Sequence, residues 1–488
     1  MFAPRLINIL KTFSPDEIKN FNKFLLSPFF NTSKIYTKFY NELKKFYPNF
    51  KNEKLTSEYV YERLFNGKPF NKQTMWNLSS GLEKLAEEFL VHSALSKYPH
   101  EKSTIILDEF LMRMLGKHYY KKLKEWEKAA AGYKIDAEEL FNLANLESYK
   151  VSFWQHIKGR FGKQAESIFE ESQIYIILFL VNIASKIDSL NTARTFRGFS
   201  ISSSLAEDFV RNIDFKRIIE ISKKNKYRYA GLIEFYYNVI FCTLERENEK
   251  YYINSRNFFF KNQKLFSYQK KKDLTAGLTN YCLEKILSGD ANFEVELFKL
   301  NKFRLKYNIA ATVNGKIGKP LYNQIINNAA TLKEFKWADS FIEKYTPLLH
   351  EEYQDSMRKL AEAYVYFNAK KFNDVLDSLN KFRSGDANDK LPVKNLIAKT
   401  YYELNEFEML MYHIDTSKHF LNKSKNISDF RKKVNGKFYN YLNSLVTVIE
   451  DNKLEKLNTL EDNIRNDNSV NNKVWLLEKI AEITKQKM

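Results

Sequence analysis

Cysteine is nearly absent from this chain of 488 residues, which holds only two. Cys242 and Cys282 lie in the apolar segments IFCTL and NYCLEKI, with no CxxC pair and no neighbouring pair of histidines. That pattern is unlike the spacing of cysteine-based metal and redox sites. We therefore expect each cysteine to be a buried free thiol, and we predict no metal site and no cofactor.

Glycine and proline are also scarce, at 14 and 9 residues. Long stretches rich in Lys, Glu, Leu, Asn and aromatic residues run without either breaker, which favours helices over many short strands. The chain is longer than one hydrophobic core usually serves, and 44% of its residues are hydrophobic. We predict an all-α protein made of two or three domains or of an elongated repeat array.

Long apolar runs are missing as well. The most apolar run, IYIILFLV at 174–181, is far shorter than the roughly 20 residues of a membrane-spanning helix, and we interpret it as part of a buried helix. The start of the chain, MFAPRLINILKTFSPDE, lacks the cationic and apolar segments of a signal peptide. We expect no membrane span and a cytoplasmic protein.

Acidic residues are outnumbered, with 59 Asp and Glu against 78 Lys and Arg, for a net charge of +19. Such a charge is typical of proteins that bind nucleic acid or anionic membranes. The abundance of Lys, Asn, Ile, Phe and Tyr is, however, also what A- and T-rich codons produce. The basic residues are dispersed, with local concentrations only at 222–228 and 261–273. Solvated helix faces explain them more simply.

The first hundred residues contain clear helix-start signals. Ser14 and Glu17 form a capping box around Pro15, and the clusters LSPFFNTS and KPFNKQT suggest that Asn31 and Asn71 are N-cap residues. We predict an N-terminal helical domain over 1–100. Its expected helices lie near 15–26, 32–46, 56–65 and 73–96.

A second helical region follows over 101–205, with apolar residues recurring every three or four positions from 103 to 190. The segment NTARTFRGFSISSSL at 191–205 is polar and rich in small residues, and it is our candidate linker. We predict a helical repeat array over 206–488.

The array is indicated by a bulky aromatic residue that recurs after a polar turn and before an apolar helix. The marker aromatics are Tyr251, Phe293, Phe335, Phe372 and Phe407. They are separated by 42, 42, 37 and 35 residues, which are the periods of two-helix repeats. Each unit is predicted to fold as helix, tight turn and helix.

Residues 321–415 resemble three tetratricopeptide repeats. The segment LAEAYVYFNAKKFNDVLDSLNKF is the most similar, with the family's small residue at Ala363, its aromatic at Tyr366 and its turn aromatic at Phe372. The resemblance implies an α–α superhelix of stacked hairpins.

Some positions depart from the family's pattern. Val375 and Leu410 occupy a second-helix position where the family usually has alanine, which this chain keeps at Ala338. The segment 441–464 is a candidate for one more degenerate hairpin, and 474–488 for a capping helix.

The resemblance also implies a function, because the first helices of such repeats line a concave groove. We expect a non-catalytic protein–protein interaction scaffold that binds a partner segment there, with Asn and Lys side chains holding an extended peptide or its carboxylate. A groove filled only by solvent remains the alternative. The groove positions carried over to this chain are Asn323, Asn327, Tyr364, Asn368, Asn395, Lys399 and Tyr402.

Nucleic-acid binding through basic N-terminal helices is the second hypothesis. The predicted helix that follows Asn71 carries polar side chains in its first turns, as the recognition helix of a helix-turn-helix does, although this stretch contains no arginine. The residues concerned are Lys72, Gln73, Asn77 and Ser80.

An enzyme is the third hypothesis, because catalytic sites can assemble from residues distant in sequence. The chain contains no HExxH, GxSxG or kinase signature, and NGKIGKP at 314–320 lacks the spacing of a phosphate-binding loop. We therefore do not expect catalysis.

Overall fold

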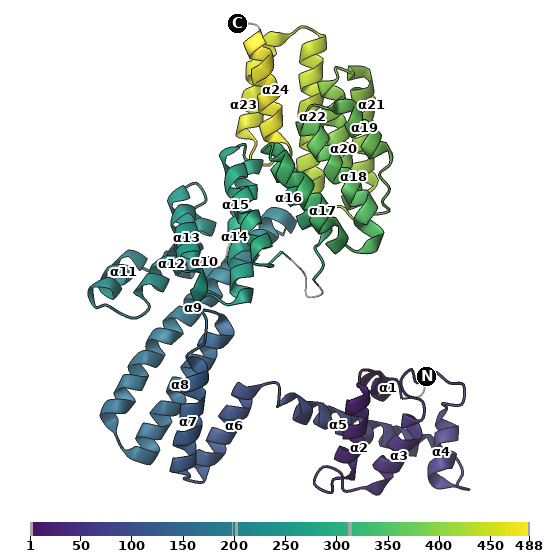
Figure 1. The fold of residues 1–488 in the computed structure, drawn as a ribbon, viewed down its shortest axis with the longest axis vertical. Helices are drawn as coiled ribbons and strands as arrows, with labels where there is room; N and C mark the ends of the chain where they lie inside the picture. Colours follow the sequence, from purple (N-terminus) through teal and green to yellow (C-terminus); the bar gives the residue numbers. More distant parts are fainter. Residues whose placement is uncertain (1–2, 198, 201–203, 311–314, 487–488) are drawn as a thin grey trace. The chain divides into compact units, whose positions relative to one another are not determined.

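A computed structural model describes residues 3–197, 199–200, 204–310 and 315–486. The chain is 78% helical, and the described part contains 24 α-helices and no strand beyond one isolated bridge between Ile135 and Phe266. The predicted all-α class is confirmed (Figure 1). By contacts the chain divides into two compact units, the first formed by Met1–Ala131 with Tyr149–Ala165 and the second by Gly132–Ser148 with Glu166–Met488. The boundaries predicted at residues 100 and 205 remain predictions.

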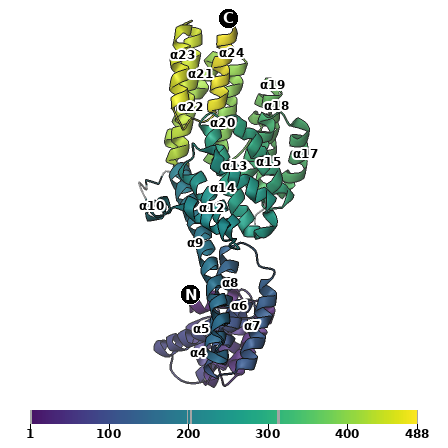
Figure 2. The same cartoon turned by 90° about the vertical axis from the view of Figure 1, so that its left-hand side faces the viewer.

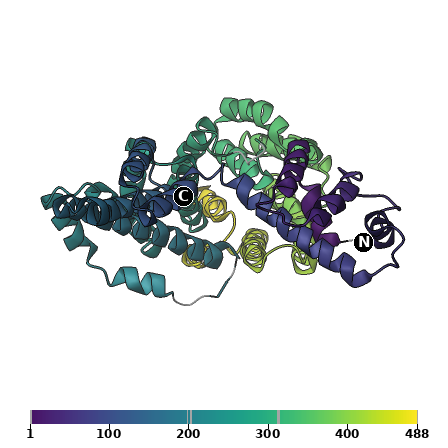
Figure 3. The ribbon, with the colours of Figure 1, turned by 90° about the horizontal axis from the view of Figure 1, so that it is seen from below.

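The first unit begins with five helices around an aromatic core that includes Phe21, Phe39, Tyr40 and Phe89. The long helix α5 contacts each of the four that precede it and is the elongated blue-purple helix of Figure 3. The five helices are α1 (Pro4–Lys11), α2 (Pro15–Leu26), α3 (Lys34–Lys44), α4 (Ser57–Phe65) and α5 (Lys72–Ala94).

Local capping explains where two of these helices start. Ser14 and Glu17 form the predicted capping box on α2, and the Asn71 side chain accepts a hydrogen bond from the Thr74 N–H at 2.9 Å. The prediction for Asn31 was wrong, because Ser33 is the N-cap of α3. The Asn31 amide instead donates to the carbonyl of Leu25 at 2.8 Å, so it links two helices.

The chain continues through four long helices and one π-helical turn. These elements are α6 (Pro99–Met112), α7 (Gly116–Ala130), α8 (Ala137–Ser152), η1 (Phe153–Lys158) and α9 (Phe161–Arg197). Because α9 extends to Arg197, the first seven residues of the predicted linker at 191–205 are helical, contrary to expectation. Of the remaining linker positions, 198 and 201–203 lie outside the described residues.

The helix α9 contains the apolar run at 174–181. Only one face of this run is buried, with Ile174 and Ile177 in the core and Tyr175 and Ile176 exposed. Among the described residues, α9 is the one helix that passes a length-and-composition test for a membrane span, a test that core helices of soluble proteins also pass. The absence of a membrane span therefore remains a prediction.

The second unit contains a core formed by α8, α9 and the six helices that follow them. They are α10 (Leu205–Arg211), α11 (Phe215–Lys224), α12 (Ala230–Leu244), α13 (Glu249–Lys261), α14 (Tyr268–Leu287) and α15 (Asn292–Lys306). Cys242 and Cys282 are free and buried in this core, as predicted. Burial raises the pKa of each thiol to about 12, so both stay protonated and unreactive.

A second core in the same unit belongs to the C-terminal helices, which pack as consecutive hairpins. These helices are α16 (Lys319–Thr331), α17 (Phe335–Tyr345), α18 (Glu351–Asn368), α19 (Phe372–Asn380), α20 (Ala387–Glu403), α21 (Phe407–Lys423), α22 (Asp429–Glu450), α23 (Leu457–Asn466) and α24 (Lys473–Gln486). The last three pack against one another (Figure 2).

The turns within three of these hairpins share one backbone geometry. Lys333, Lys370 and Asn405 have φ of 58°, 59° and 59°, and each lies two residues before a marker aromatic. The residue after each of them donates its N–H to a carbonyl five positions back, which is the helix-ending Schellman pattern. The marker aromatics therefore start the second helix of each hairpin. Whether the hairpins form a tetratricopeptide-like superhelix remains a prediction.

Candidate functional site

The alternate helices α14, α16, α18, α20 and α22 line a cavity of about 510 Å³. We call it the amide cavity, because eight of its twenty lining residues are Asn or Gln. These eight are Asn323, Gln324, Asn327, Asn388, Asn395, Asn435, Asn471 and Asn472. The four helices from α16 to α22 are each the first helix of a hairpin, and the loop before α24 supplies the last two amides.

Five of the seven groove positions predicted from the sequence lie on this cavity, namely Asn323, Asn327, Tyr364, Asn395 and Lys399. The other two lie elsewhere. Asn368 is on α18, where its amide donates to the Tyr364 carbonyl at 2.9 Å. Tyr402 is buried, with its ring centroid 5.3 Å from that of Trp475. The structure thus brings five predicted residues together and leaves two in packing roles.

A chain of amide hydrogen bonds fixes one wall of the cavity. The Asn395 and Asn471 amides both donate to the Asn435 carbonyl oxygen, at 2.6 and 2.7 Å. The Asn435 amide in turn donates to the backbone carbonyl of Arg431 at 2.7 Å. Side chains from α20, α22 and the loop before α24 are therefore held in fixed orientations, which is the condition for a specific polar site.

Several polar atoms on the cavity wall have no hydrogen-bond partner among the described residues. They are the side-chain oxygens of Asn323 and Asn395 and the amide nitrogen of Gln324. Asn395 is only 6% exposed, so its free oxygen is removed from bulk water. Leaving such an atom unpaired costs about 1–3 kcal/mol. Each of the three atoms has less than 1 Å² of exposed surface, so a ligand in the cavity can satisfy them after a rotation of their side chains.

Two cationic side chains face the same space. The Lys399 ammonium lies 4.4 Å from the ring centroid of Phe367 and 5.4 Å from that of Trp475, and no described residue forms an ion pair with it. Loss of water around the group lowers the pKa of Lys399 to about 8, despite the opposing influence of Glu403. The ammonium is still protonated at neutral pH, in surroundings that stabilise it poorly.

Arg431 is the second cation, and its guanidinium donates to the Asn388 carbonyl oxygen at 2.6 Å. The one carboxylate on the cavity wall, Asp389, already has a partner, because the Lys319 ammonium lies 2.7 Å from it. Carboxylates act on both cations, Glu403 on Lys399 and Asp386 on Arg431, but none forms an ion pair with either of them. This electrostatic balance favours an anionic group in the cavity.

Sequence reasoning missed the part of the wall contributed by α22. We predicted that the last hairpin starts at residue 441, whereas α22 begins at Asp429. Arg431 and Asn435 were therefore outside every predicted first helix. Ser428 is an N-cap that accepts the N–H of Arg431 at 3.4 Å, and a serine before an acidic residue was a signal that marked this start.

The positions of the nucleic-acid hypothesis lie on the first turns of α5. Lys72, Gln73 and Asn77 are exposed and Ser80 is half-buried, while the Gln73 amide donates to the Asn77 carbonyl oxygen at 2.9 Å. Trp76 projects from the same turns and is 66% exposed. A flat ring beside a lysine is compatible with base stacking, although Gln73 and Asn77 partly satisfy each other.

Compared with the models of known protein families, with curated proteins and with solved structures, the chain matches none of them. Within the described parts of the chain, no group of three or more His, Cys, Asp or Glu side chains is placed to hold a metal ion.

Proposed function

We propose that this protein is a non-catalytic interaction scaffold that holds an extended, acidic segment of a partner protein in the amide cavity. In this proposal the C-terminal hairpins form a tetratricopeptide-like superhelix, and its first helices present the binding residues. The observation that carries the proposal is the set of unpaired amide atoms at Asn323, Gln324 and Asn395.

An extended peptide is suited to such a wall because its backbone presents N–H and C=O groups in alternation. Side-chain amides can match both kinds of group, since each carries a donor and an acceptor. The Asn323 and Asn395 oxygens would accept peptide N–H groups, and the Gln324 amide would donate to a peptide carbonyl. Sequence-independent backbone contacts of this kind give affinity without requiring particular partner side chains.

The positive charges on the cavity wall support an acidic partner. Lys399 and Arg431 face the cavity without a matching carboxylate, because Asp389 is already paired with Lys319. An Asp or Glu side chain, or a chain-terminal carboxylate, would supply the missing negative charge. A basic segment would meet two cations and would be repelled.

The proposal is tested by purifying the tagged protein from its own cells, with and without nuclease and at low and high salt, and identifying bound proteins by mass spectrometry. Each captured protein is then measured against purified Lys399→Met and Asn395→Leu variants. We expect at least a tenfold loss of affinity in both, because each variant removes a polar group from the cavity wall. Lys390→Met is the control, since Lys390 is exposed on the same helix and does not line the cavity. Equal affinity of all four proteins for the partner would refute the proposal.

A second candidate function is single-stranded nucleic-acid binding through α5, favoured by the exposed ring of Trp76 one turn from Lys72. Aromatic rings stack on bases, and a nearby lysine contacts the backbone phosphates. If α5 has this function, nucleic acid should copurify with the tagged protein, and the copurification should be lost after nuclease treatment or at high salt. A Trp76→Ala variant that binds nucleic acid as well as the wild type would exclude this role for α5.

A further inference from the structure

A second cavity, of about 250 Å³, lies in the other core of the second unit, between α9, α12, α13 and α14. Its walls are partly apolar, with Phe235, Phe259 and Leu278 among them. The volume is several times the roughly 30 Å³ that one water molecule occupies in the liquid, so a small organic molecule fits in it. We call it the Lys270 cavity, after its most unusual lining residue.

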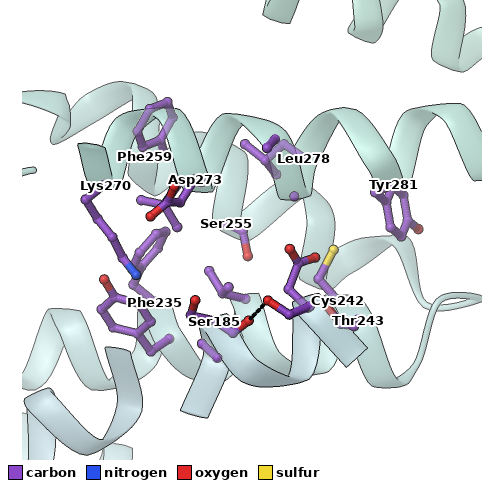
Figure 4. Close-up of a pocket in the computed structure, with 18 of the residues that line it drawn as sticks. Ser185, Phe235, Cys242, Thr243, Ser255, Phe259, Lys270, Asp273, Leu278 and Tyr281 are labelled. Carbon is purple, nitrogen blue, oxygen red and sulfur yellow. Dashed lines mark hydrogen bonds between the residues drawn. The ribbon is translucent and has the colours of Figure 1, made fainter. Parts of the chain in front are cut away.

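Lys270 is 7% exposed, and its ammonium forms no hydrogen bond or ion pair with any described residue. Its nearest recorded contact is the ring of Tyr236, whose centroid is 5.6 Å from the nitrogen. Figure 4 shows the side chains of Lys270, Ser255 and Ser185 directed into the same space between the helices. Lysine is almost never buried without a partner, because transferring the charge out of water is costly.

The position of Lys270 in its helix does not compensate for that cost. It lies in the first turn of α14, after the N-cap Ser267. The helix dipole places partial positive charge at this end, which favours anions and disfavours cations. Desolvation accordingly lowers the pKa of Lys270. Asp273, Asp136 and Asp188 oppose this shift, but none of them forms an ion pair with the ammonium. A bound anionic group in direct contact with it would relieve both effects further.

Two hydroxyl groups on lining residues of the cavity are also unpaired, although each oxygen has less than 1 Å² of exposed surface. The Tyr236 side chain is fully buried and Ser255 is 2% exposed, and neither hydroxyl has a hydrogen-bond partner among the described residues. Both residues line the Lys270 cavity. Two free hydroxyls and one free ammonium suit an acceptor with several lone pairs, as a carboxylate has.

The cavity also holds an unpaired negative group. Asp188 on α9 lines it, burial raises the pKa of this carboxyl, and no described residue donates a hydrogen bond to it. Arg246 is the cation that acts on it most strongly, but its guanidinium lies 2.6 Å from the Glu284 carboxylate and donates no hydrogen bond to Asp188. Asp273, the second acid on the wall, is exposed and accepts the Gln269 amide at 2.8 Å.

Lys270 and Asp188 therefore line one cavity and act on each other's pKa, but the charged group of neither forms an ion pair or a hydrogen bond with any described residue. A simple anion would satisfy Lys270 but meet Asp188, and a simple cation would do the reverse. A molecule with an ammonium and a carboxylate satisfies both. Its apolar part would lie against the aromatic and aliphatic walls. Ser185 and Asp273 are exposed, so the cavity reaches the surface and a ligand can enter.

From this arrangement we infer that the Lys270 cavity is a binding site for a small zwitterion of the amino-acid class, with its carboxylate at Lys270, Tyr236 and Ser255 and its ammonium at Asp188. This site is separate from the amide cavity and does not depend on the proposed scaffold function.

The test is a thermal unfolding measurement of the full chain with the pool of the twenty protein amino acids at millimolar concentration. Binding to the folded state raises the midpoint, and we expect a rise of at least about 2 °C. We expect the rise to disappear in Lys270→Met and in Asp188→Asn. Lys272→Met is the matched control, since Lys272 is exposed on the same helix turn and should retain the full response.

Four outcomes would overturn the inference. The first is that the pool does not raise the unfolding midpoint of the wild type. The second and third are that short-chain carboxylates without the amine, or the corresponding amines alone, raise the midpoint as much as the amino acids do. The fourth is that either cavity variant keeps the full rise in midpoint. If a variant does not fold, equilibrium dialysis of the wild type against the labelled pool decides the question, because retention of no amino acid also refutes the site.

Discussion

Replacing Lys399 by methionine should make the free protein more stable while it weakens partner binding. The ordinary lysine pKa of 10.5 falls to about 8 in the folded chain because the ammonium is desolvated. A difference of this size corresponds to about 3 kcal/mol of unfavourable interaction of the charged form. Contact with the rings of Phe367 and Trp475 returns about 0.5–2 kcal/mol. Methionine keeps the length and apolar character of the stem, so the expected net stabilisation at pH 7 is about 1–2 kcal/mol.

Desolvation of the Lys399 ammonium also makes the stability of the folded chain depend on pH. Below pH 8 Lys399 is protonated in both the folded and the unfolded chain, so its whole unfavourable contribution is present. As pH rises from about 8 to 10.5, the folded chain has lost the proton that the unfolded chain still binds, and the contribution disappears. The advantage of Lys399→Met over the wild type should therefore shrink across that interval.

Urea unfolding followed by circular dichroism at pH 7 and near pH 10.5 measures this difference as a shift in the transition midpoint. Lys390→Met, an exposed substitution on the same helix, should change the midpoint little at either pH. If Lys399→Met lowers stability at pH 7, or if its effect is the same at both pH values, the ammonium is not desolvated as described and the reasoning is wrong.

Three further predictions concern other parts of the chain. Burial raises the pKa of Glu294 to about 7, so the folded chain loses stability as pH rises from 4.5 to 7. Glu294→Gln should therefore stabilise the folded chain by roughly 1–3 kcal/mol at pH 8. Urea unfolding should show no such stabilisation at pH 4. Lys370 has a φ of 59°, so Lys370→Gly should raise the free energy of unfolding by up to about 1 kcal/mol, seen as a higher urea midpoint. Lys371→Gly, at a φ of −92°, should lower the midpoint. Ser14→Ala removes the cap of α2 and should cost about 1 kcal/mol, seen as faster amide hydrogen exchange in that helix.

Short-range chemistry made much of the fold predictable. The start of α2 at Pro15 and the cap at Asn71 follow from hydrogen bonds within four residues, and a pattern of that length is readable in one sequence. Asn31 follows a phenylalanine, as Asn71 does, but its amide donates to the Leu25 carbonyl on the preceding helix. That choice depends on how α2 and α3 pack, which no local pattern specifies.

The amide cavity was partly predictable from the resemblance to tetratricopeptide repeats. The groove positions that the resemblance implies include Asn323, Asn395 and Lys399, and all three line the cavity. Asn435 was missed because the predicted start of its helix was twelve residues too late. The Lys270 cavity had no sequence signal at all, since its residues come from four helices and share no motif.

Both cavities are lined by buried polar groups without partners, and these groups lower the stability of the ligand-free chain. Hydroxyls, amides and an ammonium without partners are costly to bury, so a chain under selection for stability alone would replace them. Some of these groups lie on cavity walls, at Tyr236, Ser255 and Lys270 in one case and at Asn323 and Asn395 in the other, while others, such as Tyr439 and Ser417, are buried elsewhere. A ligand recovers that cost only in the cavity where it binds. Lys270→Met and Lys399→Met should accordingly each stabilise the free protein, and each should abolish a different binding activity. A variant that loses both activities would instead indicate one shared site.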